Sequence, residues 1–211
     1  MGTPAAVVFD IGNVLFHWHP RFLYERLIAD DQALEAFLRD VLTLEWHFQH
    51  DEGRPFAETS AELIAEHPQH EALIREWGPR FNESIGDPVK GMHELVAELD
   101  AAGVPLFAIT NFSGEFFRPF RAAHADLFGR FRDIVVSGDE KLVKPDPEIW
   151  ALSLERFGIP AGSLVFVDDN EANVAGATAA GFHAVHFTDE PAFRAELVRL
   201  GLLPDTEAKV A

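Results

Sequence analysis

The chain has 211 residues, enough for one sizeable hydrophobic core and a smaller appendage but hardly for two full domains. Its 35 acidic and 17 basic residues give a formal net charge of −18, which repels nucleic acids and anionic membranes, so we expect neither as a partner. The absence of cysteine excludes disulfides and thiolate chemistry, and with no membrane-spanning run or signal-peptide pattern evident we expect a cytoplasmic protein.

Short apolar segments alternate with helical patterns along most of the chain. The expected strands, in chain order, are 6–9, 105–110, 134–137, 164–167 and 184–187. The expected helices are 89–102, 114–124, 147–157, 171–180 and 191–200. This alternation predicts an α/β fold, a three-layer Rossmann-like core in which helices cover both faces of a parallel sheet.

One long interval, from about Pro20 to Gly86, contains no evident strand. Apolar residues recur there at spacings of three and four, as in Leu34, Phe37 and Leu38, and prolines punctuate the pattern. We expect a small all-helical cap at 17–86, inserted between the first two strands of the core. Residues 1–16 and 87–211 would then form the Rossmann-like catalytic core.

Polar residues stand at or just beyond the carboxyl ends of four expected strands, where ligand crevices form in open α/β sheets. They are Asp10, Thr110 with Asn111, Lys144, and Asp168 with Asp169. Adjacent carboxylates raise each other's pKa unless a cation lies between them. Oxygen ligands without cysteine suit Mg²⁺, so the pattern predicts a magnesium site.

Four segments, VVFDIGNVL, ITNFS, VKPDPEIW and FVDDNEANVAGA, resemble in sequence and order the motifs of the haloacid dehalogenase superfamily. The helical interval occupies the place of that family's first-position cap. DIGNV resembles a branch with sugar phosphatases, including one acting on glucose 1-phosphate. The resemblance implies a Mg²⁺-dependent phosphatase that hydrolyses a small phosphorylated metabolite, with a sugar phosphate as one option, through an aspartyl-phosphate intermediate.

The resemblance also implies how the phosphoryl group is handled. Asp10 would be the nucleophile that forms the covalent intermediate. Thr110 and the backbone of Asn111 would hydrogen-bond the transferring group. Lys144 would neutralise the charge shared by Asp10 and the phosphate. Catalysis would then consist mainly of charge stabilisation and in-line positioning.

A second set of implied roles concerns the metal. Mg²⁺ would be bound by the carboxylates of Asp10 and Asp169 and by the backbone carbonyl of Gly12. Asp168 would orient the catalytic lysine from behind, and Asn173 would support the waters on the metal. These roles follow from the resemblance and not from spacing alone.

One position departs from the family pattern. Most phosphatases of the superfamily carry a second aspartate two residues after the nucleophile, as general acid and base, whereas this chain has Gly12. His17 or His19 could replace that acid, because a histidine exchanges protons near neutral pH; alternatively, both are exposed hinge residues. In the cap, His47 and His50 could contact substrate or serve only cap–core packing.

Two other functions compete with the phosphatase. A 2-haloacid dehalogenase also attacks with an aspartate and needs no acid, but dehalogenases of this family replace the acidic Asp168–Asp169 pair by serine and asparagine. A non-catalytic phosphate-binding relic of the fold would not need to keep all four of Asp10, Thr110, Lys144 and Asp169. The sequence leaves the physiological substrate open, and the protein could be a monomer or a homodimer.

Overall fold

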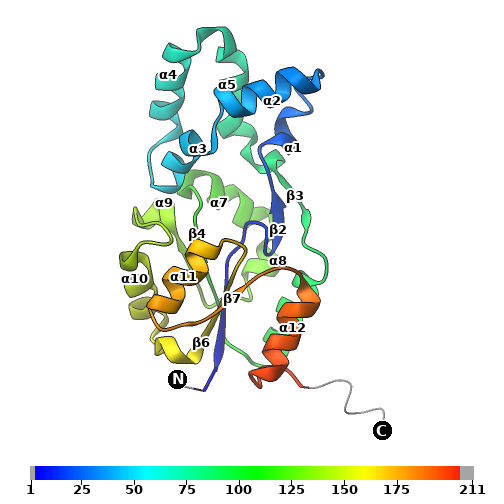
Figure 1. The fold of residues 1–211 in the computed structure, drawn as a ribbon, viewed down its shortest axis with the longest axis vertical. Coiled ribbons are helices and arrows are strands. Elements are labelled where there is room, and N and C mark those ends of the chain that lie inside the picture. The colour runs from blue at the N-terminus through cyan, green and yellow to red at the C-terminus, as the bar shows by residue number, and fades with distance from the viewer. Residues whose placement is uncertain (1–2, 205–211) are drawn as a thin grey trace.

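A central sheet of five parallel strands organises the computed structural model, which describes residues 3–204 (Figure 1). The last seven residues of the predicted core, 205–211, lie outside the described part. The strand order is β5-β4-β1-β6-β7. The strands are β1 (Ala6–Phe9), β4 (Leu106–Thr110), β5 (Asp133–Val136), β6 (Leu164–Asp168) and β7 (His183–His186). The α/β fold class is confirmed, and each strand lies within a residue of its predicted range.

β1 lies at the centre of the sheet and is buried along its length, paired with β4 on one side and β6 on the other. Val7 and Phe9 belong to one hydrophobic cluster, Ala6 and Val8 to another, as the alternation of a strand requires. The first cluster includes residues from α6 (Met92–Ala101), α7 (Gly114–Ala123), α8 (Ala125–Phe128) and α12 (Glu190–Arg199). The second includes residues from α10 (Pro147–Phe157) and α11 (Glu171–Ala179). This is the three-layer arrangement.

Residues 21–84 contain helices and no strand, and they form a lobe, called the cap below, that stands beyond the sheet's carboxyl edge (Figure 1). Its helices are α1 (Arg21–Tyr24), α2 (Asp31–Asp40), α3 (Leu44–Asp51), α4 (Phe56–Glu66) and α5 (Glu71–Arg80), with short 3₁₀ turns at Pro68–His70 and Phe81–Ser84. Tyr24, Phe37 and Trp77 pack together in its interior. The cap thus has an aromatic core of its own.

An antiparallel ribbon that the sequence analysis did not predict joins the cap to the core. β2 (Phe16–Trp18) pairs with β3 (Ile85–Pro88), so that Trp18 lies opposite Ile85. β2 has only three residues, and β3 contains glycine, aspartate and proline, which are depleted in strands, so neither segment carries a strand pattern. The ribbon runs across both of the predicted boundaries between cap and core.

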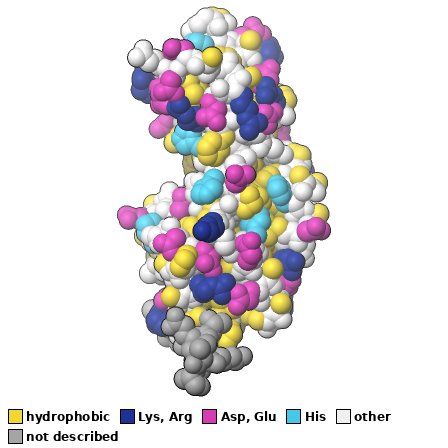
Figure 2. Space-filling view, turned by 90° about the vertical axis from the view of Figure 1, so that its right-hand side faces the viewer, with side chains coloured by type: hydrophobic (Ala, Val, Ile, Leu, Met, Phe, Trp, Pro, Cys, Tyr) yellow, Lys and Arg dark blue, Asp and Glu magenta, His cyan; other side chains and the backbone are white. Residues whose placement is uncertain are grey.

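Charged side chains are spread over both parts of the molecule, while hydrophobic and histidine side chains gather near the waist between them (Figure 2). Two large hydrophobic residues of the described chain are exposed, Leu44 at 58% and Phe48 at 36%. Both belong to α3. No helix among residues 3–204 combines the length and the apolar character needed to cross a bilayer.

Candidate active site

A cavity of about 330 Å³ lies between the cap and the carboxyl edge of the sheet, a volume within the usual range for small-molecule sites. Asp10 enters it from the end of β1, Asn111 from the end of β4 and Asp169 from the end of β6. The chain order reverses at β1, because β4 and β6 lie on its opposite sides. Ligand crevices in open α/β sheets form at such switch points.

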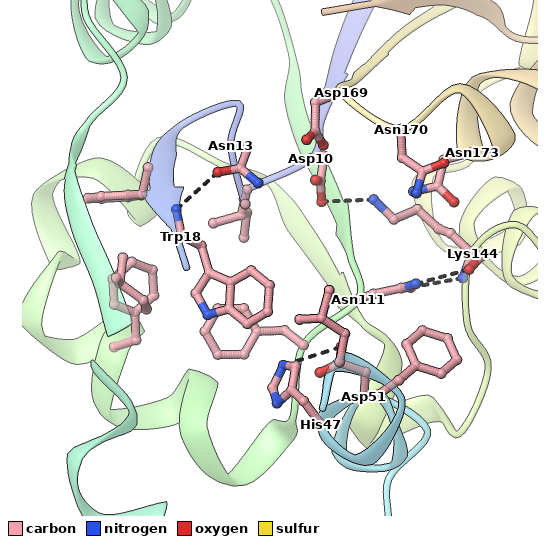
Figure 3. Close-up of a pocket in the computed structure, with 18 of the residues that line it drawn as sticks. Asp10, Asn13, Trp18, His47, Asp51, Asn111, Lys144, Asp169, Asn170 and Asn173 are labelled. Carbon is pink, nitrogen blue, oxygen red and sulfur yellow. Dashed lines mark hydrogen bonds and ion pairs between the residues drawn. The ribbon is translucent and has the colours of Figure 1, made fainter. Parts of the chain in front are cut away.

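Lys144 is buried at the floor of this cavity, where it points toward Asp10 (Figure 3). Its Nζ donates to Asp10 Oδ1 at 2.8 Å and to Asp168 Oδ2 at 2.6 Å. Burial by itself would lower the pKa of Lys144, but the two carboxylates outweigh it and raise the pKa. The ammonium therefore stays charged at neutral pH.

The side chain of Asn111 fixes the backbone that carries this lysine. Its Oδ1 accepts from the N–H of Lys144 at 2.8 Å, and its Nδ2 donates to the carbonyl of Lys144 at 2.9 Å. Asn111 therefore connects the end of β4 to the loop after α9 (Ser137–Glu140). Only a backbone role was predicted for Asn111, so its side-chain hydrogen bonds with Lys144 are a feature that the sequence did not reveal.

Asp168 is fully buried, and both of its oxygens are occupied by donors. Oδ1 accepts from the backbone N–H of Asn170 at 2.8 Å, and the Nδ2 of Asn173 lies 3.2 and 3.1 Å from Oδ1 and Oδ2. Oδ2 also accepts from Lys144. Asp168 thus has little capacity left for a metal and is placed to hold the lysine.

The donor chemistry of the site suits a hard cation. One carboxylate oxygen each from Asp10, Asp168 and Asp169 lie within 4.8 Å of one another. Burial raises the pKa of Asp10 and of Asp169, and the negative charge of Asp168 adds to both shifts. Because donors occupy both oxygens of Asp168, whereas Lys144 pairs with only Oδ1 of Asp10, we expect Asp10 and Asp169 to be the carboxylates that meet a cation. An all-oxygen set with few protein ligands fits Mg²⁺.

Gly12 lines the cavity two residues after Asp10, where the sequence lacks the expected second aspartate. A Cβ built at Gly12 would meet no atom within 4 Å, and its φ lies outside the left-handed region. The position is therefore not reserved for glycine by space or by backbone conformation. The backbone at this position could therefore carry an aspartate, and the acid is missing only because the sequence has glycine there.

Several predicted residues do not line the cavity. His17 and His19 are exposed and outside the lining, and the Nδ1 of His19 accepts from the backbone N–H of Arg21. Thr110 is buried at the end of β4 and also falls outside the lining. His47 lines the cavity, whereas the Nε2 of His50 lies 2.7 Å from the hydroxyl of Thr59 inside the cap.

Residues that the sequence analysis passed over complete the wall. Asn13 lines the cavity with a positive φ of 54°, and its Oδ1 accepts from the backbone N–H of Trp18. Asp51 reaches the cavity from the end of α3. Asn13 stands in the DIGNV segment and could have been found there. For Asp51 no local pattern gave a signal, because it depends on how the cap sits over the core.

The fold and this site together define a class of protein. The chain matches the family model of the haloacid dehalogenase-like hydrolases over residues 4–181 and therefore belongs to that family. A similar curated protein is the sesquiterpene phosphatase astK of Aspergillus oryzae, 30% identical over 200 residues that cover 94% of this chain and 97% of the relative. These findings confirm the predicted enzyme class, a hydrolase of this family, and support its assignment to the phosphoric monoester hydrolases.

Solved structures share the fold at low sequence identity. A haloacid dehalogenase family enzyme from Bacteroides thetaiotaomicron, in complex with magnesium and inorganic phosphate, has a TM-score of 0.68 at 19% identity, covering 88% of this chain and 95% of its own. The L-2-haloacid dehalogenase from Xanthobacter autotrophicus has a TM-score of 0.63 at 19% identity, covering 95% and 85%. Phosphate and halide chemistry therefore occur on the same fold, and the site has to decide between them.

Proposed function

We propose that this protein is a Mg²⁺-dependent phosphatase that transfers the phosphoryl group of a small phosphomonoester first to Asp10 and then to water. The observation that carries the proposal is the pairing of Asp10 with Lys144 beside Asp169, at the floor of a closed-over cavity. A carboxylate for attack, an ammonium for charge and a second carboxylate for a cation are what phosphoryl transfer requires.

In this proposal Asp10, Asp169 and the backbone carbonyl of Gly12 hold the metal. When bound, Mg²⁺ supplies positive charge that offsets the charge of the phosphoryl group. Asp168 and Asn173 act from behind by holding Lys144, which the hydrogen bonds around Asp168 support. Without a cation, three carboxylates against one ammonium would repel a phosphate dianion.

Side chains and backbone groups of this chain neutralise and hydrogen-bond the phosphoryl group. Lys144 neutralises the carboxylate of Asp10 and the equatorial oxygens of the phosphoryl group. The backbone after Thr110, at Asn111, donates hydrogen bonds to that group. We also propose that residues 17–86 act as the cap, which excludes water over a core made of 1–16 and 87–211. A cytoplasmic location and a monomeric or homodimeric state stay predictions.

The organic part of the substrate is, we propose, apolar. Away from the catalytic floor most of the cavity wall consists of side chains that cannot hydrogen-bond a sugar's hydroxyls, and His47 and Asp51 are polar exceptions; the apolar set is Leu44, Phe48, Phe81, Ile85, Phe112 and Phe120. Leu44 and Phe48 are also the exposed large hydrophobics of the described chain. The name of the sesquiterpene phosphatase relative agrees with an apolar group, and the sugar phosphate option finds no comparable support in the wall.

Phosphate release in Mg²⁺ from a terpenyl monophosphate, glucose 1-phosphate and glucose 6-phosphate tests this function. We expect kcat/KM for the terpenyl ester to exceed that of either sugar phosphate at least about tenfold, because apolar surface leaves water only with the former. Leu44→Gln should lower that ratio, while Glu45→Gln, exposed on the same helix and outside the cavity, should leave it unchanged. A faster sugar phosphate would contradict the apolar class.

The dehalogenase alternative predicts a different product from the same aspartate. Chloride release from 2-chloropropionate in the presence of a chelator measures it directly. We expect none above background, because the acidic Asp169 beside Asp10 disfavours an anionic substrate unless a cation is bound. Chloride release in chelator together with absent phosphate release would replace the phosphatase by the dehalogenase.

A further inference from the structure

Among residues 3–204, the β1 side of the cavity offers no acid for the leaving group apart from the proposed nucleophile and metal ligand, Asp10 and Asp169. Gly12 has no side chain, and His17 and His19 lie outside the lining. Lys144 is committed to Asp10 and Asp168 by two ion pairs. An alkoxide leaves phosphorus slowly unless an acid protonates it, so the proton should come from the opposite wall.

Asp51 stands on that wall, at the last turn of α3, across the cavity from Asp10 (Figure 3). Its side chain is buried, and its Oδ1 has no hydrogen-bond partner among the described residues. The backbone N–H of Ser113 donates to its carboxyl group, and Oδ2 lies 3.7 Å from the Nε2 of His47. A buried polar atom that lines a cavity and lacks a partner is expected to meet one in the ligand.

Asp51 and its neighbour His47 differ in their protonation near neutral pH. The pKa of Asp51 is raised to about 8, mainly by burial; the charges of Asp10 and Glu52 add to the shift, whereas the Ser113 N–H and Lys144 oppose it. Burial lowers the pKa of His47 to about 3. Near pH 7 the carboxyl of Asp51 therefore holds a proton that it can give, and His47 does not.

The backbone around Asp51 is fastened to the core. The hydroxyl of Ser137 donates to the carbonyl of Asp51 at 2.6 Å and accepts from the N–H of Phe112 at 2.9 Å. Gly53 follows with a φ of +90°, and a Cβ there would lie 2.7 Å from the carbonyl oxygen of Gly138. The end of α3 thus sits directly against the core backbone, which holds the carboxyl group over the site.

We propose that Asp51 is the general acid and base of the reaction, supplied by the cap in place of the side chain that Gly12 lacks. The proposal rests on the phosphatase function proposed above. In the first step Asp10 bonds to phosphorus, the bond from phosphorus to the ester oxygen breaks, and Asp51 gives its proton to that oxygen, which leaves as an alcohol. In the second step the Asp51 carboxylate takes a proton from the attacking water; the phosphorus bond to Asp10 breaks, and phosphate and the Asp10 carboxylate are released.

A leaving-group series separates this role from a structural one. The substrates are p-nitrophenyl, phenyl, benzyl and octyl phosphate, in order of increasingly poor leaving groups. We expect Asp51→Asn to lower kcat/KM, which reports the steps up to departure of the alcohol, by about 10²–10⁴-fold for benzyl and octyl phosphate, the usual contribution of an acid, and by less than about fivefold for p-nitrophenyl phosphate. Asparagine keeps an acceptor for Ser113, and Glu45→Gln, exposed on the same helix and outside the cavity, should behave as wild type.

Each outcome decides the matter. Equal losses of kcat/KM across the series would reduce Asp51 to a positioning residue, and no loss would place the acid elsewhere; either overturns the proposal. Should Asp51→Asn fail to fold, the wild-type series still tests the proposal, since a steep decline of kcat/KM from phenyl to octyl phosphate would show that no acid acts and would overturn it. A wild type that hydrolyses none of the four, aryl esters included, would instead refute the phosphatase function.

Discussion

Replacement of Asp10 by asparagine is expected to lower phosphatase turnover by about 10⁴-fold or more while the fold persists. An amide cannot form the covalent bond to phosphorus, and loss of a nucleophile removes the pathway that the other groups serve. The fold should survive because Lys144, deprived of Asp10, keeps its ion pair with Asp168 at 2.6 Å. Released phosphate and thermal unfolding of the same preparation give the two readouts.

The matched control for this change is Asp126→Asn, on α8, since Asp126 is exposed and outside the cavity. It should leave both readouts at wild-type values. If Asp10→Asn retained more than a tenth of the wild-type rate, water or another side chain would attack phosphorus, and the covalent route would be wrong.

Removal of Mg²⁺ is expected to have the second largest effect, a fall of activity to background in chelator that added Mg²⁺ reverses. The cause is electrostatic: with no cation, the carboxylates around Lys144 leave the site negative and repel the substrate's phosphate. Asp169→Asn should raise the Mg²⁺ concentration for half-maximal activity by about 100-fold, because a hard anionic ligand is lost from a small set.

Binding of the metal can be followed without turnover. Mg²⁺ that binds only the folded state raises the unfolding temperature, so wild type should show a concentration-dependent shift that Asp169→Asn loses over the same range. Glu171→Gln, exposed on the first turn of α11, should retain the shift. Full activity in chelator, or a shift that is unchanged in Asp169→Asn, would exclude the metal site as drawn.

The core of the fold could be predicted from sequence because its signals are local. β1 and α10 have the predicted bounds, since a buried strand is a short apolar run and Pro147 marks the first turn of a helix. The predicted helix 89–102 begins later, at Met92, because Gly91 precedes it with a φ of +83°. The strand order, by contrast, depends on pairing between distant segments, so no local sequence pattern predicts it.

In the candidate site, too, some residues could be predicted from local sequence and others depend on contacts between distant segments. The proximity of Asp10, Lys144 and Asp169 could be predicted from the sequence, because the carboxyl ends of parallel strands meet at one edge of the sheet. The reach of Asp51 into the cavity could not, since it depends on Ser137 and Gly138 receiving the end of α3. The two-sided contact of Asn111 with Lys144 needed coordinates as well.

The central place of β1 has a consequence for biosynthesis. Val7 pairs with Leu106 and with Val165. During synthesis about a hundred further residues must therefore be made before β1 can pair with β4, and still more before it can pair with β6. Contacts of such high sequence separation slow folding, and an unpaired apolar strand is prone to aggregation. A nascent chain that stops short of β6 therefore leaves one side of β1 unpaired and lacks Asp169, so the site cannot form until the chain has been made at least that far.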